Sequence, residues 1–456
     1  MVLVLLFACV QTWVWAATPD QWRGRTIYQL LTDRFARPDG DTSPCADLNN
    51  YCGGGFKGIQ DNLDYITGMG FDAIWISPIV ANVAGNYHGY AANNIYEINS
   101  NFGSEQDFIN MVQACHQADV YVMVDVVANH MGIAPFDQLY PFNESIYYHP
   151  FCNIDDWNNQ TQVIYCWLDA LPDLDQSNPY VRTTLLAWIQ DLVTKYDIDG
   201  LRIDTVPEVA ADFWAEFQQA AGVYGVGEVF NGDVNYVAQY QGVLDGTLEY
   251  PLYFNLKDWF VYGNSLFGAR SFNQSAEVFP DQGLLGVFID NHDNPRFLSL
   301  TSNEMAFKNA IAWEMTTMGI PIHYYGDEQG FSGGNPPANR ETLWPYLTQT
   351  NSALYDYVKT VVSFRKTMQV WLYDWVERWA DTNFYCFSRG LAMMCFSNTQ
   401  TTLQYSVTYH PYENGQVVCN AIWQGDCVTV TNGVLPVTLV GGECKLYAPK
   451  VQLVDS

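Results

Sequence analysis

Short apolar runs that alternate with longer stretches of helical spacing constrain this fold more than any other feature. Each run is apolar along its length and leads into a polar tip, as buried parallel strands do. The runs cover residues 26–30, 71–76, 121–127, 200–204, 225–228, 286–290 and 319–325. A weaker strand signal near 243–248 brings the number to eight. The stretches between them carry helical spacing, for example at 105–118, 181–195 and 304–318.

This alternation predicts an α/β fold, a (β/α)8 TIM barrel. Polar residues follow many different strands at one end, which favours a closed barrel over an open doubly wound sheet. The segment 130–175 is irregular and too long for an ordinary loop, so we expect a small domain inserted after strand 3. Alternating patterns then predict a C-terminal antiparallel β-sandwich domain. The predicted division is a signal peptide at 1–17, the barrel at 18–129 and 176–370, the inserted domain at 130–175 and the C-terminal domain at 371–456.

The first 17 residues predict secretion. They carry no charge, are mostly apolar and end in Ala16-Ala17, as a cleaved signal peptide does. A buried strand or an anchor is the alternative, but the run is short for a bilayer, and no later stretch is long and apolar enough to span one. We therefore expect a secreted, extracellular protein with no membrane attachment.

The cysteines agree with an oxidising compartment. Removal of Cys9 with the signal peptide leaves 11 − 1 = 10, an even number suited to disulfides. Two close pairs are plausible bridges, Cys45 with Cys52 and Cys152 with Cys166. Glycosylation sequons, each weak alone, begin at Asn143, Asn159 and Asn273.

The charge balance limits the partners. Lys and Arg number 20 and Asp and Glu 49, so the net charge is 20 − 49 = −29. This is the wrong sign for coating nucleic acid or anionic lipid. A neutral or cationic ligand is expected, with no nucleic-acid partner and with a monomer as the default.

Three carboxylates at strand tips are the candidate catalytic groups. Asp204, Glu228 and Asp293 follow three different predicted strands, where buried charge is costly and needs a reason. Structural ion pairs would explain any one of them. Glycosidic cleavage would explain all three, because it needs one carboxylate at the anomeric carbon and one carboxylic acid at the leaving oxygen. Repulsion and burial would raise the pKa of one member and keep its proton available.

Other polar residues near these tips suit sugar binding. Arg202 lies two residues before Asp204 on one strand and points to the same side, so it can hold Asp204 ionised as a nucleophile. Aromatic and imidazole rings stack on sugars and hydrogen-bond their hydroxyls. The candidate rings are Tyr90, His88, His130 and His292.

At these residues the chain resembles the α-amylases of glycoside hydrolase family 13, closest to the secreted fungal type. The matching motifs occur in the order of the family: DVVANH at 125–130, LPDLD at 171–175, GLRID at 200–204, GEV at 227–229 and DNHDNPR at 290–296. The resemblance implies that Asp204 is the nucleophile, Glu228 the general acid/base and Asp293 the transition-state stabiliser. It also places Arg340 with Arg202, the three histidines and Tyr90 around the sugar.

The resemblance also implies a structural calcium ion between the barrel and the inserted domain. Asn129 and Asp173 match two side-chain ligands, and oxygen ligands are what this hard cation requires. Ile164 occupies the position of a third, usually a carboxylate, and can offer only its backbone oxygen. Glu208 occupies a position that usually binds through its carbonyl, and its carboxylate offers further oxygens in compensation.

Further departures lie in the substrate cleft. Pro207-Glu208 replaces a Lys-His pair that contacts acceptor-side sugars, so Glu208 is also a candidate substrate-binding residue. Ala91 replaces a Trp that follows the stacking Tyr, and Pro336 replaces an Asp. The leading prediction is a secreted, retaining, endo-acting α-1,4-glucan hydrolase that cleaves starch and malto-oligosaccharides. A 4-α-glucanotransferase with the same covalent intermediate is the first alternative, and a non-catalytic glucan-binding protein is the second.

Overall fold

Eight parallel strands form the centre of the computed structural model, which describes residues 17–423 and 425–453. The sheet order is β8-β7-β6-β5-β2-β1-β10-β9, and an isolated bridge between Leu248 and Gly286 joins its two edges into a nearly closed barrel. The strands are β1 (Ile27–Leu30), β2 (Ala73–Ile76), β5 (Tyr121–Val126), β6 (Gly200–Ile203), β7 (Tyr224–Gly227), β8 (Gly246–Thr247), β9 (Gly286–Val287) and β10 (Ile320–Tyr324). The predicted barrel is confirmed, the weak eighth strand included.

Close packing explains the composition of the shortest strands. β8 and β9 begin with Gly246 and Gly286, and a Cβ at Gly246 would lie 2.0 Å from the carbonyl oxygen of Leu284. The other strands are buried almost throughout, so they consist of continuous apolar residues rather than alternating ones.

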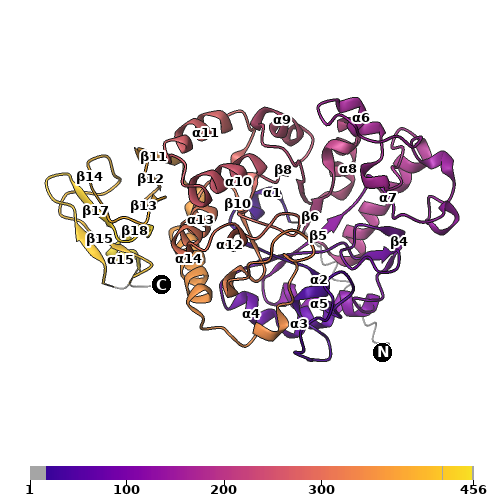
Figure 1. The fold of residues 1–456 in the computed structure, drawn as a ribbon, viewed down its shortest axis with the longest axis horizontal. Helices are drawn as coiled ribbons and strands as arrows, with labels where there is room; N and C mark the ends of the chain where they lie inside the picture. Colours follow the sequence, from indigo (N-terminus) through magenta and orange to yellow (C-terminus); the bar gives the residue numbers. More distant parts are fainter. Residues whose placement is uncertain (1–16, 424, 454–456) are drawn as a thin grey trace, which may run out of the picture.

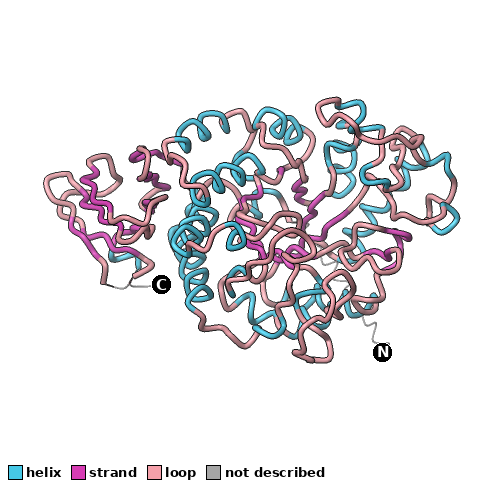
Figure 2. Tube along the Cα trace, viewed as in Figure 1, coloured by secondary structure: helices cyan, strands magenta, loops and turns pink. Residues whose placement is uncertain are grey.

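Helices surround the strands (Figure 2). The three helices expected from spacing are present as α5 (Glu105–Gln117), α7 (Pro179–Tyr196) and α13 (Glu304–Thr316). α5 begins at Ser104, whose side chain accepts from the backbone N–H of Asp107, while Asp107 caps Ser104 in return. The other helices of the barrel region are α1 (Pro19–Trp22), α2 (Thr32–Phe35), α3 (Phe56–Asp61), α4 (Leu63–Thr67), α8 (Ala211–Ala221), α9 (Val234–Ala238), α10 (Tyr250–Leu256), α11 (Gly268–Ala276), α12 (Phe297–Leu300) and α14 (Ala353–Met368).

The chain between β5 and α7 forms an irregular lobe with one helix, α6 (Gln160–Tyr165), and three short 3-10 turns. The disulfide Cys152–Cys166 closes its centre. A hairpin of β3 (Val80–Asn82) and β4 (Ala92–Ile98) follows β2, and β4 is bridged to the lobe at Tyr140. The lobe lies at one end of the molecule and the C-terminal domain at the other (Figure 1).

The C-terminal domain contains two antiparallel sheets that share one core. The larger has the order β11-β12-β13-β18-β15-β16 and the smaller pairs β14 with β17. Met393 and Tyr447 from the first sheet pack in one apolar cluster with Val407 and Val437 from the second, as in a sandwich. The elements are β11 (Trp375–Ala380), β12 (Phe384–Arg389), β13 (Ala392–Ser397), β14 (Leu403–Val407), β15 (Val417–Asn420), β16 (Cys427–Thr429), β17 (Leu435–Leu439), β18 (Lys445–Pro449) and the short helix α15 (Lys450–Leu453).

Disulfides join eight of the cysteines in the described part of the chain. Both predicted pairs are present, and Cys386–Cys395 and Cys419–Cys427 add two more in the C-terminal domain. Two buried cysteines have no disulfide partner among the described residues, Cys115 and Cys444. The predicted signal peptide, Cys9 included, lies outside the described residues except for Ala17. No helix between residues 17 and 453, as far as these are described, has the length and apolar character to cross a bilayer.

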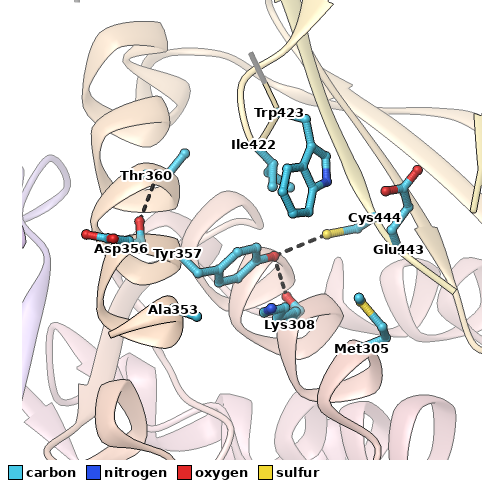
Figure 3. Close-up of a pocket in the computed structure, with 10 residues that line it drawn as sticks. All are labelled: Met305, Lys308, Ala353, Asp356, Tyr357, Thr360, Ile422, Trp423, Glu443 and Cys444. Atoms are coloured by element: carbon cyan, nitrogen blue, oxygen red, sulfur yellow. Dashed lines mark hydrogen bonds between the residues drawn. The ribbon is translucent and has the colours of Figure 1, made fainter. Parts of the chain in front are cut away.

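A pocket of about 260 Å³ lies where α13 and α14 meet the C-terminal domain (Figure 3). Tyr357 forms part of its wall, and the Tyr357 hydroxyl lies 3.2 Å from the Cys444 sulfur across this junction. None of the three candidate catalytic carboxylates lines it. The pocket therefore belongs to the packing of the domains rather than to the candidate site.

Candidate active site

Three carboxylates meet at the carboxyl ends of the barrel strands. Asp204 follows β6, Glu228 follows β7, and Asp293 lies in the loop after β9. Glu228 and Asp293 line one pocket of about 610 Å³. Asp204 is connected to the same pocket through Arg202, whose guanidinium contacts both Asp204 and Glu228.

Arg202 is a buried cation that binds three carboxylates. Its Nη1 donates to Asp204 Oδ1 at 2.7 Å and to the two oxygens of Asp125 at 3.0 and 3.1 Å. Its Nη2 lies 2.9 Å from Glu228 Oε2. Because removal of one partner would leave buried charge unpaired, the four groups hold each other in place. The arginine thereby fixes the spacing of Asp204 and Glu228 and favours the ionised form of Asp204.

Tyr90 and three histidines lie beside this cluster. The Tyr90 hydroxyl donates to Asp125 Oδ2 at 2.7 Å, and its ring lies nearly parallel to those of His88 and His292. His130 Nε2 is 3.1 Å from the carbonyl oxygen of Tyr90. Burial lowers the pKa of His88 and of His130 to about 4. Both imidazoles are then neutral near pH 7, and a neutral ring both donates and accepts hydrogen bonds, as sugar hydroxyls require.

Asp293 is the most exposed of the three carboxylates, with 35% of its side chain accessible. Arg340 Nη2 donates to its Oδ1 at 3.2 Å, and His292 Nε2 lies 3.0 Å from its Oδ2. The loop that carries Asp293 is clamped by buried Asn339, whose amide donates to the carbonyl oxygens of His292 and Asn294 at 3.0 and 2.8 Å. Partial burial opposes ionisation, but the contacts with His292 and Arg340 outweigh it and lower the pKa of Asp293.

The surroundings shift the pKa values of the three carboxylates by different amounts and in different directions. Burial raises the pKa of Glu228 to about 7, Arg202 opposes this, and the charges of Asp204 and Asp293 add to it. Burial also raises the pKa of Asp204, again against Arg202. Glu228 can therefore keep a proton near pH 7 while Asp293 is ionised. Such a division supplies an acid and a carboxylate at one site.

Two aromatic side chains that the sequence analysis did not select form the outer wall of the pocket. Trp157 and Phe230 both line it, and they are 58% and 57% exposed. A flat exposed ring beside a pocket that contains carboxyl groups is a surface for stacking a sugar. Phe230 stands two residues after Glu228 and could have been selected on that ground, whereas Trp157 depends on how the inserted lobe folds.

Glu208 also lines this pocket. The turn that carries it begins at Thr205, which has the left-handed φ of 49°. Among the described residues, none makes a hydrogen bond to the buried Glu208 Oε2. Burial raises the pKa of Glu208 to about 8, and the nearby charge of Glu228 contributes.

The residues predicted to hold calcium come together only in part. One terminal atom of the Asn129 amide lies 2.9 Å from Asp173 Oδ1 and 3.3 Å from the carbonyl oxygen of Glu208. With its nitrogen there, Asn129 donates to both. With its oxygen there, the three oxygens form part of a shell suited to a hard cation. Asp173 Oδ2 is already bound by His149 at 2.6 Å.

Ile164 adds no side-chain oxygen to this set. It lies on α6, which packs against the turn Val206–Glu208. Within residues 17–423 and 425–453, no cluster of three or more His, Cys, Asp or Glu side chains is arranged to hold a metal ion. Any cation here would rely on amide and carbonyl oxygens in addition to Asp173.

Most of this chain is similar in sequence to known proteins. Residues 29–369 match the family described as alpha amylase, catalytic domain. Alpha-amylase 2 of Schwanniomyces occidentalis is 38% identical over 466 residues, which cover 95% of this chain and 92% of that protein. Alpha-amylase 1 of Lipomyces kononenkoae is 45% identical over 368 residues, which cover 76% of this chain but only 59% of that protein.

A solved structure is similar over almost the whole chain. The structure of an alpha-amylase from Malbranchea cinnamomea gives a TM-score of 0.93 at 37% sequence identity. The superposition covers 96% of this chain and 99% of that one. Its agreement extends from the barrel to the C-terminal domain.

Proposed function

Because this chain belongs to the α-amylase family, which it matches over residues 29–369, we propose that it is a retaining, endo-acting α-1,4-glucan hydrolase of starch and malto-oligosaccharides. It is a glycoside hydrolase of the α-amylase type. One observation carries the finer proposal: Arg202 binds Asp204 and Glu228 together at the pocket that Asp293 lines. The arrangement joins a carboxylate held ionised to a carboxyl that retains its proton.

The reaction proceeds by double displacement. Glu228 donates its proton to the glycosidic oxygen while Asp204 attacks the anomeric carbon, so the leaving sugar departs and a covalent glycosyl-Asp204 forms. Glu228 then removes a proton from water, the water oxygen attacks the anomeric carbon, and the bond to Asp204 breaks. Asp293 stabilises the positive charge that develops on the sugar ring in both steps. Configuration is retained because the carbon is attacked twice.

The surrounding polar groups bind the sugar at the cleavage point. His88, His130, His292 and Tyr90 contribute their rings, and Arg340 orients Asp293. Arg202 stays on the protein side of the two reacting carboxylates. Glu208 lines the same pocket and binds acceptor-side hydroxyls.

Calcium has a structural place in this proposal. Asn129, Asp173 and the carbonyl oxygen of Glu208 would hold it, with Ile164 supplying no side-chain ligand. The ion would join the inserted lobe to the turn after β6 and take no part in proton transfer. The closeness of the Asn129 amide group to Asp173 Oδ1 and to the Glu208 carbonyl oxygen supports this placement.

The wider assignments follow the same proposal. Four disulfides are what an oxidising compartment produces, so the protein is secreted, with residues 1–17 as the signal peptide. Residues 130–175 form the inserted domain, 18–129 and 176–370 the barrel, and 371–456 the C-terminal domain. The partner is an α-glucan rather than nucleic acid or membrane, and the protein acts as a monomer.

The test is incubation of purified protein with maltoheptaose, with product lengths and new reducing ends followed together. Hydrolysis gives shorter products and a matching rise in reducing ends. Products longer than the substrate with few new reducing ends would establish a 4-α-glucanotransferase instead. No change in the substrate would favour the glucan-binding protein. The isosteric variant Glu228→Gln is the control, because it should bind sugar but lose turnover.

A further inference from the structure

Gln29 contacts the catalytic loop from inside the barrel. It lies in β1 and is only 1% exposed. Its Nε2 is 2.7 Å from His292 Nδ1, and both side chains are buried. A buried amide this close to an imidazole nitrogen determines which ring nitrogen carries the proton, because two donors cannot face each other.

The other ring nitrogen of His292 faces two oxygens. His292 Nε2 lies 2.7 Å from the Tyr90 hydroxyl and 3.0 Å from Asp293 Oδ2. The Tyr90 hydroxyl already donates its proton to Asp125 Oδ2 at 2.7 Å, so towards His292 it can only accept. A proton on Nε2 is therefore accepted by the Tyr90 hydroxyl, and the same N–H group then stands 3.0 Å from Asp293 Oδ2. A lone pair on Nε2 would face a carboxylate oxygen and a hydroxyl whose proton is engaged.

We propose that Gln29 is a positioning residue that keeps His292 in the Nε2–H tautomer, so that an N–H group rather than a lone pair stands beside Asp293. In this tautomer the Gln29 amide donates to His292 Nδ1, and His292 Nε2–H faces the Tyr90 hydroxyl and Asp293. Gln29 touches neither the sugar nor a reacting atom. Its effect reaches the reaction only through His292.

The consequence concerns the transition state more than substrate binding. The role of Asp293 rests on the proposed function, in which it stabilises charge on the sugar ring. In the other tautomer the Nε2 lone pair would repel the Asp293 carboxylate and displace it, and small displacements of a positioned group cost up to about 100-fold in rate. Sugar stacking and outer contacts do not depend on Gln29, so KM should change little while kcat falls.

The first experiment measures the tautomer directly. Histidine labelled with ¹⁵N is incorporated, and long-range ¹H–¹⁵N spectra are recorded near neutral pH, with the His292 signals among the 7 histidines identified by comparison with His292→Asn. We expect an unprotonated Nδ1 and a protonated Nε2. A protonated Nδ1 in the wild-type protein would overturn the proposal, because Gln29 would then act as acceptor.

The second experiment changes the amide. Gln29→Glu keeps the shape but offers an acceptor, so it should move the proton to Nδ1 and lower kcat about 10- to 100-fold on maltoheptaose. Gln29→Leu removes the donor and should lower kcat with KM nearly unchanged. Gln241→Leu is the matched control, because Gln241 is also buried and hydrogen-bonded but to the Asp281 carbonyl oxygen, away from the site. It should keep the wild-type kcat.

The outcomes separate the two proposals. A folded Gln29→Leu with wild-type kcat would refute the positioning role, as would Gln29→Glu with a switched tautomer and wild-type kcat. If Gln29→Glu does not fold, the wild-type spectrum and Gln29→Leu still decide. Absence of turnover by the wild-type protein would refute the proposed function, and it would be recognised separately because the tautomer measurement needs no turnover.

Discussion

Glu228 keeps its proton to a higher pH than an ordinary glutamate does, because it is buried and lies near other carboxylates. Burial and the carboxylates Asp204 and Asp293 raise its pKa to about 7, although Arg202 lies 2.9 Å away. The same arginine also holds Asp204, so one cation stabilises the nucleophile while the acid remains protonated. The chemistry thus depends on how three carboxylates share the positive charge of Arg202.

The pH profile of kcat/KM should reflect this arrangement. The acid form of Glu228 is present below its raised pKa, so activity should fall about tenfold per pH unit above about 7. The raised pKa of Asp204 should place the acid limb above that of an ordinary aspartate. Initial rates on maltoheptaose across the pH range would measure both limbs.

Glu228→Gln should lose about 100- to 10,000-fold in kcat, and unchanged activity would contradict the assignment.

Phe230 offers a test of the outer wall of the pocket. The ring is 57% exposed beside Glu228, so Phe230→Ala should remove a stacking surface while leaving the reacting groups in place. An aromatic contact contributes about 1 kcal/mol, so KM for maltoheptaose should rise about fivefold with kcat little changed. Phe267→Ala is the control, because Phe267 is exposed but does not line the pocket. Equal effects of both variants on KM would contradict a role in binding.

At the scale of elements, the inserted lobe depends on few stabilising links. Trp157 lies inside the loop that Cys152–Cys166 closes, and Asn129 and Asp173 join the lobe to the barrel. The helical content here is small, so covalent and polar links replace the packing that holds the barrel helices. The lobe should therefore respond to changes that leave the barrel unaffected.

Removal of the Cys152–Cys166 disulfide should destabilise the inserted lobe and leave the barrel unaffected. For a loop of this length, a disulfide contributes about 3 kcal/mol to the free energy of unfolding. The double variant Cys152→Ser/Cys166→Ser should raise amide exchange within the lobe and raise KM, since Trp157 loses its support. Cys386→Ser/Cys395→Ser in the C-terminal domain is the control and should leave KM unchanged. Wild-type exchange in the lobe would refute the prediction.

Calcium removal tests the second link. Chelator should lower the melting temperature and raise exchange in the lobe, because the oxygens of Asn129, Asp173 and Glu208 would lose their common partner. Asn129→Leu should be less stable in calcium and insensitive to chelator. Identical melting curves with and without chelator, together with metal analysis that finds no bound calcium, would contradict the calcium proposal.

The sequence predicted those elements and site residues whose position follows from local periodicity. Strand runs place Asp204 and Glu228 at one end of the barrel, and the two-residue period places Arg202 beside Asp204. Gln29, Asn339 and Trp157 were not selected, because their contacts join segments far apart in the chain. Gln29, for example, reads as one more residue of a buried strand until the barrel brings His292 within 2.7 Å.

For the whole molecule, the charge of −29 is a source of self-repulsion. Salt screens such repulsion, with a Debye length of about 10 Å at 0.1 M. The melting temperature should therefore rise by about 2 °C between low-salt buffer and sodium chloride at physiological strength. Scanning calorimetry at fixed pH would measure it. A fall in melting temperature would mean that attractive ion pairs outweigh the net charge.

Trp157 and Phe230 are carried by different segments from the groups that break the bond, so the two sets can change separately in evolution. The groups that break the bond stand at the ends of barrel strands, whereas these two rings stand on the inserted lobe and on the loop after β7. Mutations in the lobe or loop can alter which oligosaccharide lengths accumulate without disturbing proton transfer. Natural variants with new product profiles should therefore carry their changes in these outer segments, and the lobe is where a laboratory library would best be placed.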